Sequence, residues 1–121
     1  MSRQATGHVG ETLAANYLKA HGYTILNLNW RCDQPKGEID IVARDGETLV
    51  FVEVRSRHSP TTETAFASIT PRKQAKLVRT VELYLQLHNL TDQAWRIDVI
   101  AVALPRGAQP IIDHVENALD W

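Results

Sequence analysis

The sequence has a single cysteine, Cys32, among its 121 residues. No intrachain disulfide can form, and a zinc site built on several cysteines is excluded. The chain also lacks a run of about 18 apolar residues, which a transmembrane helix needs. Its first residues lack the apolar stretch of a secretory signal peptide. We therefore expect a cytoplasmic protein that makes no membrane contact.

The chain also has no large excess of positive or negative charge. The chain has 13 Lys and Arg residues against 14 Asp and Glu residues, and its formal net charge is -1. Such a chain has no global attraction for polyanions, so nucleic-acid binding would depend on local basic patches. Hydrophobic residues make up 44% of the chain. At this length, that share predicts one α/β domain over residues 1–121 with a modest core.

The most informative stretch runs from residue 37 to residue 57. Apolar residues recur at every second position in 39–43 and again in 50–54, which is the pattern of β-strands. Asp45 and Gly46 stand between the two segments and have the chemistry of a tight turn. The stretch therefore predicts two antiparallel strands joined by a two-residue turn.

This turn would fix which side chains meet across the hairpin. It sets Asp40 opposite Phe51 and Glu38 opposite Glu53. A three-residue loop would instead slip the pairing by one residue and separate Asp40 from Glu53. With the two-residue turn, four charged side chains share one face: Glu38, Asp40, Glu53 and Arg55.

The clustered carboxylates have two interpretations. Carboxylates placed side by side among Val and Ile repel one another and lose hydration unless a cation or hydrogen bonds offset the cost. Mg²⁺ would do so, since it binds one or two protein carboxylates and leaves positions for water and phosphate oxygens. Glu53 and Arg55 would then serve metal and phosphate together. A solvated sheet face of mixed charge explains the same spacing equally well.

Other signals place the remaining elements. Helical spacing of apolar residues predicts a helix from Thr6 to His21, ended by Gly22 in the left-handed conformation. Thr70 followed by Pro71 predicts a second helix, which runs to about His88. The other predicted elements are an edge strand at 23–30, loops at 31–37 and 58–69, strands at 95–103 and 110–114, and a helical turn at 117–119.

The second predicted helix carries the clearest basic stripe of the chain. Arg72, Lys76 and Arg79 recur at intervals of four and three residues, with Lys73 alongside. Such a stripe can contact a phosphate backbone without regard to base sequence. An ordinary solvated helix face is the alternative.

Two carboxylates outside the hairpin have competing roles. Glu11 lies near the opening of the first predicted helix, where it would interact favourably with the helix dipole. A supporting place in a metal site is the other interpretation. Asp98 lies on a predicted strand, and we expect Arg96 or a neighbour to hold it structurally rather than a metal.

Several of these residues stand in an order that resembles a known family. Glu11, residues 37–40 and residues 51–57 are similar to the YraN-like family of small bacterial proteins. The resemblance spans nearly the whole chain, including residues 70–74 and 96–100. That family resembles archaeal Holliday-junction resolvases. The resemblance thus implies a restriction-endonuclease-like fold, in which helices flank a mixed central β-sheet.

The resemblance also implies an activity. Asp40 and Glu53 match the two acidic positions of the PD-(D/E)xK signature, Arg55 stands at the lysine position, and Glu11 resembles the acidic residue of the first helix. Asp40 and Glu53 would hold Mg²⁺ or Mn²⁺, with Glu11 or Glu38 completing the acidic shell. The implied reaction is hydrolysis of phosphodiester bonds in DNA, branched or otherwise structured.

Two departures from the signature leave an alternative open. No proline precedes Asp40, and Arg55 replaces the lysine; a guanidinium stays protonated and cannot accept a proton from water. A catalytically weak or inactive nucleic-acid-binding module, acting with DNA repair or recombination partners, is therefore the second hypothesis. Cutting a four-way junction would need two active sites and hence a homodimer. The expected nucleic-acid contacts are Arg57, Arg72, Lys73, Lys76 and Arg79.

Overall fold

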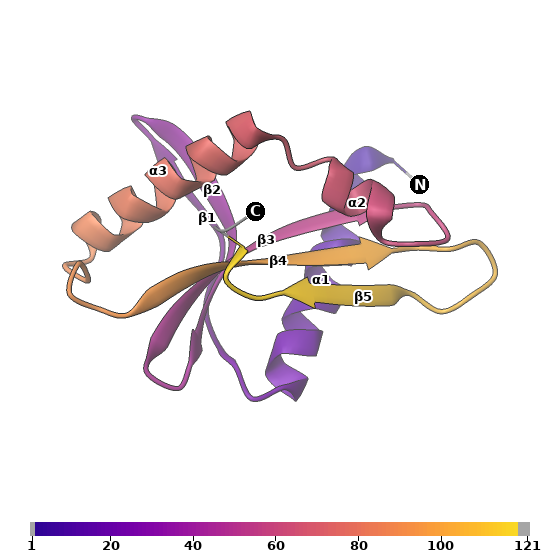
Figure 1. Cartoon of the computed structure of the whole chain (residues 1–121), viewed down its shortest axis with the longest axis horizontal. Helices are drawn as coiled ribbons and strands as arrows, with labels where there is room; N and C mark the ends of the chain where they lie inside the picture. The colour runs from indigo at the N-terminus through magenta and orange to yellow at the C-terminus, as the bar shows by residue number, and fades with distance from the viewer. Residues whose placement is uncertain (1, 119–121) are drawn as a thin grey trace.

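The computed structural model describes residues 2–118 and shows a mixed five-stranded sheet flanked by helices (Figure 1). The strands lie side by side in their sequence order: β1 (Thr24–Asp33), β2 (Lys36–Asp45), β3 (Thr48–Arg57), β4 (Trp95–Ala103) and β5 (Ile111–Val115). β3 and β4 run parallel, and the other neighbours run antiparallel. The predicted α/β class and mixed central sheet are confirmed.

Helices cover both faces of the sheet because β3 is apolar on both sides. Val50, Val52 and Val54 pack in one core with α1 (Arg3–Ala20). Leu49 and Phe51 point to the other face and pack in a second core under α3 (Pro71–Leu87). Within residues 2–118, no helix has the length and hydropathy needed to cross a membrane.

The first helix begins earlier than the sequence predicted. Ser2 is its N-cap, and the Ser2 hydroxyl accepts a hydrogen bond from the Ala5 N–H at 3.0 Å. Gly22 follows the helix with φ of +87°, as predicted. Because the helix starts at Arg3, Glu11 lies in its middle. The expected interaction of Glu11 with the helix N-terminus is therefore wrong.

The predicted loop at 31–37 is also wrong, because its residues extend β1 and β2 into a long hairpin. Asp33 pairs with Lys36, so Gln34 and Pro35 make the turn. β1 forms an edge of the sheet, as predicted. The predicted loop at 58–69 contains a short helix, α2 (Glu63–Ala67). Of the predicted turn at 117–119, residue 119 lies outside the described residues.

The β2–β3 turn differs from the prediction by one position. Asp45 pairs with Thr48, which makes Gly46 and Glu47 the turn, and Gly46 adopts a φ of +60°. Val42 therefore lies opposite Phe51. The expected pairings of Asp40 with Phe51 and of Glu38 with Glu53 are wrong. Each partner shifts by two residues, and a shift of two keeps the paired residues 41–45 and 48–52 on their predicted faces. Ile39 is an exception, because it packs with Phe51 in the second core and not with Ile41.

Two glycines let the helices approach the sheet closely. A Cβ atom on Gly10 of α1 would collide with the Ser56 side chain on β3, and one on Gly37 of β2 would collide with Thr80 on α3. Gly10 lies inside α1, within the range predicted to be helical. These contacts fix α1 and α3 against the strands that carry the predicted site residues.

Candidate functional site

The site forms where β2 and β3 separate. The last paired residues of the two strands are Ile41 and Val52. Beyond them, the Asp40 carboxylate accepts a hydrogen bond from the Val54 backbone N–H at 2.8 Å. The side chain thus takes the place of the missing strand pairing. Asp40 is held next to Glu53, in the arrangement that the two-residue shift in register produces.

Arg55 follows Glu53 on the same face of β3 and forms a long ion pair with it. Its guanidinium Nη1 lies 3.7 Å from Glu53 Oε1, and its Nε donates a hydrogen bond of 2.8 Å to the Ser68 hydroxyl. The Ser68 hydroxyl in turn donates to the Ala65 carbonyl at 2.6 Å. The C-terminal end of α2 therefore holds the Arg55 side chain in place. This role of Ser68 was not predicted, because the sequence indicated a loop here.

The carboxylates of this site are under electrostatic strain. Burial raises the pKa of Asp40 to about 8, the charge of Glu53 adds to the rise, and the Val54 hydrogen bond opposes it. Burial also raises the pKa of Glu53, while hydrogen bonding to Asp40 and the charge of Arg55 oppose that rise. Within the described chain, no cation balances Asp40. A partly buried carboxyl group with a raised pKa and no cation beside it is typical of functional sites.

Glu11 reaches the same region from α1. Burial raises the pKa of Glu11 above its ordinary value, and the charge of Asp40 is the next cause. Hydrogen bonding to the Asn29 side chain partly opposes the rise. Asn29 has φ of +53° within β1, a conformation that asparagine tolerates better than most residues. The sequence reading missed Asn29, for which the only signal was an asparagine between the apolar residues of a strand.

A cleft of about 530 Å³ lies beside these carboxylates, between the β1–β2 hairpin and α3. Glu38 lines it and pairs with Arg31, the Arg31 Nε lying 3.3 Å from a Glu38 oxygen. Glu53 and Arg55 also line it. Its lining residues are Arg31, Cys32, Asp33, Lys36, Gly37, Glu38, Glu53, Arg55, Ile69, Lys73, Lys76, Leu77 and Thr80.

Only some of the basic residues predicted to contact nucleic acid line this cleft. Lys73 and Lys76 line it, whereas Arg72 and Arg79 are exposed elsewhere on α3. Arg57, at the end of β3, lies outside it, and burial together with the charges of Arg55 and Arg3 lowers the pKa of Arg57. Of the four basic residues of the α3 stripe, two therefore line the cleft beside the carboxylates and two do not.

The donor chemistry of the site fits a divalent cation. Within residues 2–118, no three His, Cys, Asp or Glu side chains converge on one position that a metal ion could fill. Mg²⁺, however, needs only one or two protein carboxylates. Asp40 and Glu53 are adjacent and partly buried, and the charge of Glu53 raises the pKa of Asp40. A cation between them would offset both charges, and Glu11 and Glu38 are close enough to affect the same pair.

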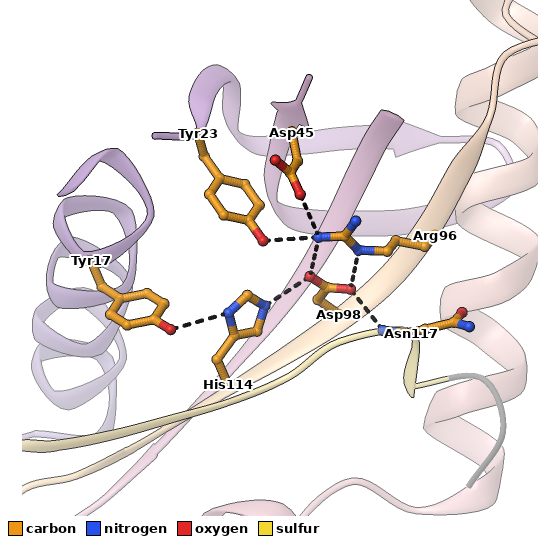
Figure 2. Close-up of polar contacts among 7 residues, drawn as sticks. All are labelled: Tyr17, Tyr23, Asp45, Arg96, Asp98, His114 and Asn117. Atoms are coloured by element: carbon orange, nitrogen blue, oxygen red, sulfur yellow. Dashed lines mark hydrogen bonds and ion pairs between the residues drawn. The ribbon is translucent and has the colours of Figure 1, made fainter. Parts of the chain in front are cut away.

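A second buried carboxylate has the opposite surroundings. Figure 2 shows the polar network on the α1 face of the sheet, formed by Tyr17, Tyr23, Asp45, Arg96, Asp98, His114 and Asn117. Asp98 is fully buried, with Arg96 Nε at 3.0 Å and His114 Nε2 at 2.8 Å. Burial raises the pKa of Asp98, but hydrogen bonds from His114, Arg96 and the Asn117 N–H outweigh it and hold this pKa below its ordinary value. The predicted structural pairing of Asp98 with Arg96 is confirmed.

Comparison with known proteins gives one consistent family. The model of the family described as "Uncharacterised protein family UPF0102" matches residues 10–102. A UPF0102 protein of Dehalococcoides mccartyi is 45% identical over 118 residues, covering 98% of this chain and 95% of the relative. One from Streptomyces coelicolor is 44% identical, covering 96% and 89%. One from Chloroflexus aurantiacus is 47% identical, covering 97% and 94%. In agreement with the resemblance seen in the sequence, this chain belongs to the UPF0102, or YraN-like, family.

Proposed function

We propose that this protein is a metal-dependent endonuclease that hydrolyses phosphodiester bonds in DNA, built on a restriction-endonuclease-like fold. The observation that carries the proposal is the pair of partly buried carboxylates, Asp40 and Glu53, set side by side with raised pKa values, with Glu53 lining a basic cleft. Two such groups are costly to bury without a cation. The similarity of the sequence motif to PD-(D/E)xK nucleases points to the same residues.

Each residue of the site has a distinct task. Asp40 and Glu53 would hold Mg²⁺ or Mn²⁺, and Glu11 and Glu38 would add negative charge around it. The bound metal supplies Lewis acidity toward a phosphate oxygen and lowers the pKa of an attacking water. Arg55, fixed by Ser68, presents its guanidinium where it can bind a phosphate oxygen and stabilise developing negative charge.

One observation favours a second candidate, a nucleic-acid-binding module that cuts slowly or not at all. Arg55 stands where related nucleases have lysine, and its guanidinium remains protonated at neutral pH. It orients phosphate but cannot accept a proton. If the reaction needs a proton acceptor at this position, the protein binds DNA in company with repair or recombination partners.

Cleavage assays test the proposal. Labelled single-stranded, duplex, flap and four-way-junction DNA are incubated with the protein and Mg²⁺ or Mn²⁺. We expect cutting by the native chain, loss of cutting in Asp40→Asn and Glu53→Gln, and full activity in Asp92→Asn. Asp92 is an exposed residue of the α3–β4 loop and serves as the matched control. Equal cutting by the native chain and Asp40→Asn would contradict the proposal, because it would point to a contaminating nuclease.

A further inference from the structure

The cleft beside the carboxylates has two walls that come from distant parts of the chain. The tip of the β1–β2 hairpin forms one wall, and the first half of α3 forms the other. Figure 1 shows these two elements next to each other. Gly37 and Thr80 join the walls at the base, where a Cβ on Gly37 would have no room. The walls therefore cannot separate there without breaking this contact. Glu53 and Arg55 are reached from within the cleft.

The lining is basic although the whole chain is slightly acidic. Five of its residues are Lys or Arg and three are Asp or Glu, which gives a local charge of about +2 against -1 for the chain. The two arginines each lie within 4 Å of a carboxylate in the lining. Within the described chain, the three lysines have no such partner: Lys36, Lys73 and Lys76.

The three lysines without a carboxylate partner stand on both walls, and Lys73 donates a hydrogen bond to the Ser68 carbonyl at 3.2 Å. Lys36 belongs to the hairpin tip, and Lys73 and Lys76 belong to α3. Ammonium groups on opposite walls of one cleft repel one another unless an anion lies between them. A polyanion that runs along the cleft would contact both walls at once. A duplex lying over α3 would contact the helix lysines and leave the hairpin lysine unused.

We propose that the cleft binds one unpaired strand of DNA, with its phosphates between Lys36 and the two α3 lysines. Its volume of about 530 Å³ is that of a cleft for a small molecule. One or two nucleotides of a single strand have this size, and a base-paired helix does not. This inference rests on the proposed function in one respect: the bound strand would deliver a phosphate to Arg55 and Glu53.

Binding measured without divalent metal tests the inference separately from cleavage. Fluorescence anisotropy is recorded in EDTA with a labelled short single strand and with the duplex of the same sequence. We expect the single strand to bind at least about fivefold more tightly than the duplex. Lys36→Gln and Lys76→Gln should each weaken single-strand binding roughly threefold to tenfold, and each should lower the slope of log affinity against log salt by about 0.7.

Two controls separate a charge effect from a folding effect. Lys36→Arg keeps the charge and should retain binding. Lys19→Gln removes an exposed charge at the end of α1, away from the cleft, and should bind as the native chain does. Duplex affinity equal to that of the single strand, or native affinity in Lys36→Gln, would overturn the inference. Single-strand binding without any cutting in Mg²⁺ would overturn the proposed activity and leave this inference standing.

Discussion

Replacing Asp40 by Asn should stabilise the metal-free protein at alkaline pH. The pKa of Asp40 rises from its ordinary 3.8 to about 8 in the folded state, chiefly through burial and then through the charge of Glu53. Between these two pH values, the folded chain keeps a proton that the unfolded chain has released. The free energy of unfolding therefore falls as the pH rises from about 4 to about 8. Asn has no proton to lose, and its amide oxygen can still accept the hydrogen bond from the Val54 N–H.

The size of the effect follows from the rise in pKa. At about 1.4 kcal/mol per pH unit, a rise of about four units gives a ceiling of about 6 kcal/mol. Asp40 is partly accessible to solvent, which screens its charge, so the expected gain of Asp40→Asn above pH 8 is on the order of 2–4 kcal/mol. Near pH 4, where Asp40 is protonated in both states, the gain should be close to zero.

Urea unfolding in EDTA at several pH values measures this difference, with Asp92→Asn as the control that removes an exposed carboxylate. Excess Mg²⁺ should raise the stability of the native chain at alkaline pH and leave that of Asp40→Asn nearly unchanged, because ligands stabilise only the state that binds them. An Asp40→Asn variant that is less stable than the native chain at alkaline pH would refute the reasoning. The reasoning would also be refuted if the free energies of unfolding of the variant and the native chain differed by the same amount at every pH.

Three further substitutions test neighbouring parts of the structure. Ser68→Ala removes the hydroxyl that accepts a hydrogen bond from Arg55, whose guanidinium lies 3.7 Å from Glu53. Arg55 should then move closer to Glu53 and compete with the metal, so calorimetry should show a several-fold lower affinity for Mn²⁺. Ser68→Thr keeps a hydroxyl and should keep the native Mn²⁺ affinity. Arg55→Lys should raise the Mg²⁺-dependent cleavage rate increasingly from neutral to alkaline pH, because lysine can lose its proton; an unchanged pH–rate profile would argue against that role. Asp98→Asn should lower the free energy of unfolding by about 3–5 kcal/mol, since it leaves Arg96 without its buried partner. Because the pKa of Asp98 is held below its ordinary value, urea unfolding should show this contribution at neutral pH and its loss as the pH falls through the folded-state pKa.

The sequence predicted the faces of the central hairpin better than its pairing. Alternation of apolar residues fixes which side chains share a face, and this part of the prediction held for Glu53 and Arg55. The turn was assigned to Asp45 and Gly46, whereas Gly46 and Glu47 form it. Since both turns contain the glycine that the backbone requires, turn chemistry alone could not distinguish them. The error of two residues moved Glu53 from Glu38 to Asp40 without changing its face.

The contacts that sequence reasoning missed join residues far apart in the chain. Ser68 reaches Arg55 only because a five-residue helix forms where polar composition indicated a loop. The hairpin tip at 31–37 contains Pro and Gly, which are also typical of irregular loops. Asn29 approaches Glu11 because Gly10 brings α1 close to the sheet. The contacts of Ser68 and Asn29 produce no periodic pattern in the sequence, because each depends on packing between separate elements.

Asp98, which is fully buried, and Asp40, which is partly buried, differ in a way that bears on function. Asp98 has an arginine, a histidine and a backbone N–H around it, so its charge is stabilised and its place is structural. Asp40 has one backbone N–H and the carboxylates of Glu53 and Glu38 as neighbours. Among residues 2–118, the fold therefore supplies a cation to the Asp98 carboxylate and none to that of Asp40. A charge that lowers stability persists when it serves a ligand or a reaction, and for Asp40 the ligand that its surroundings favour is a divalent cation.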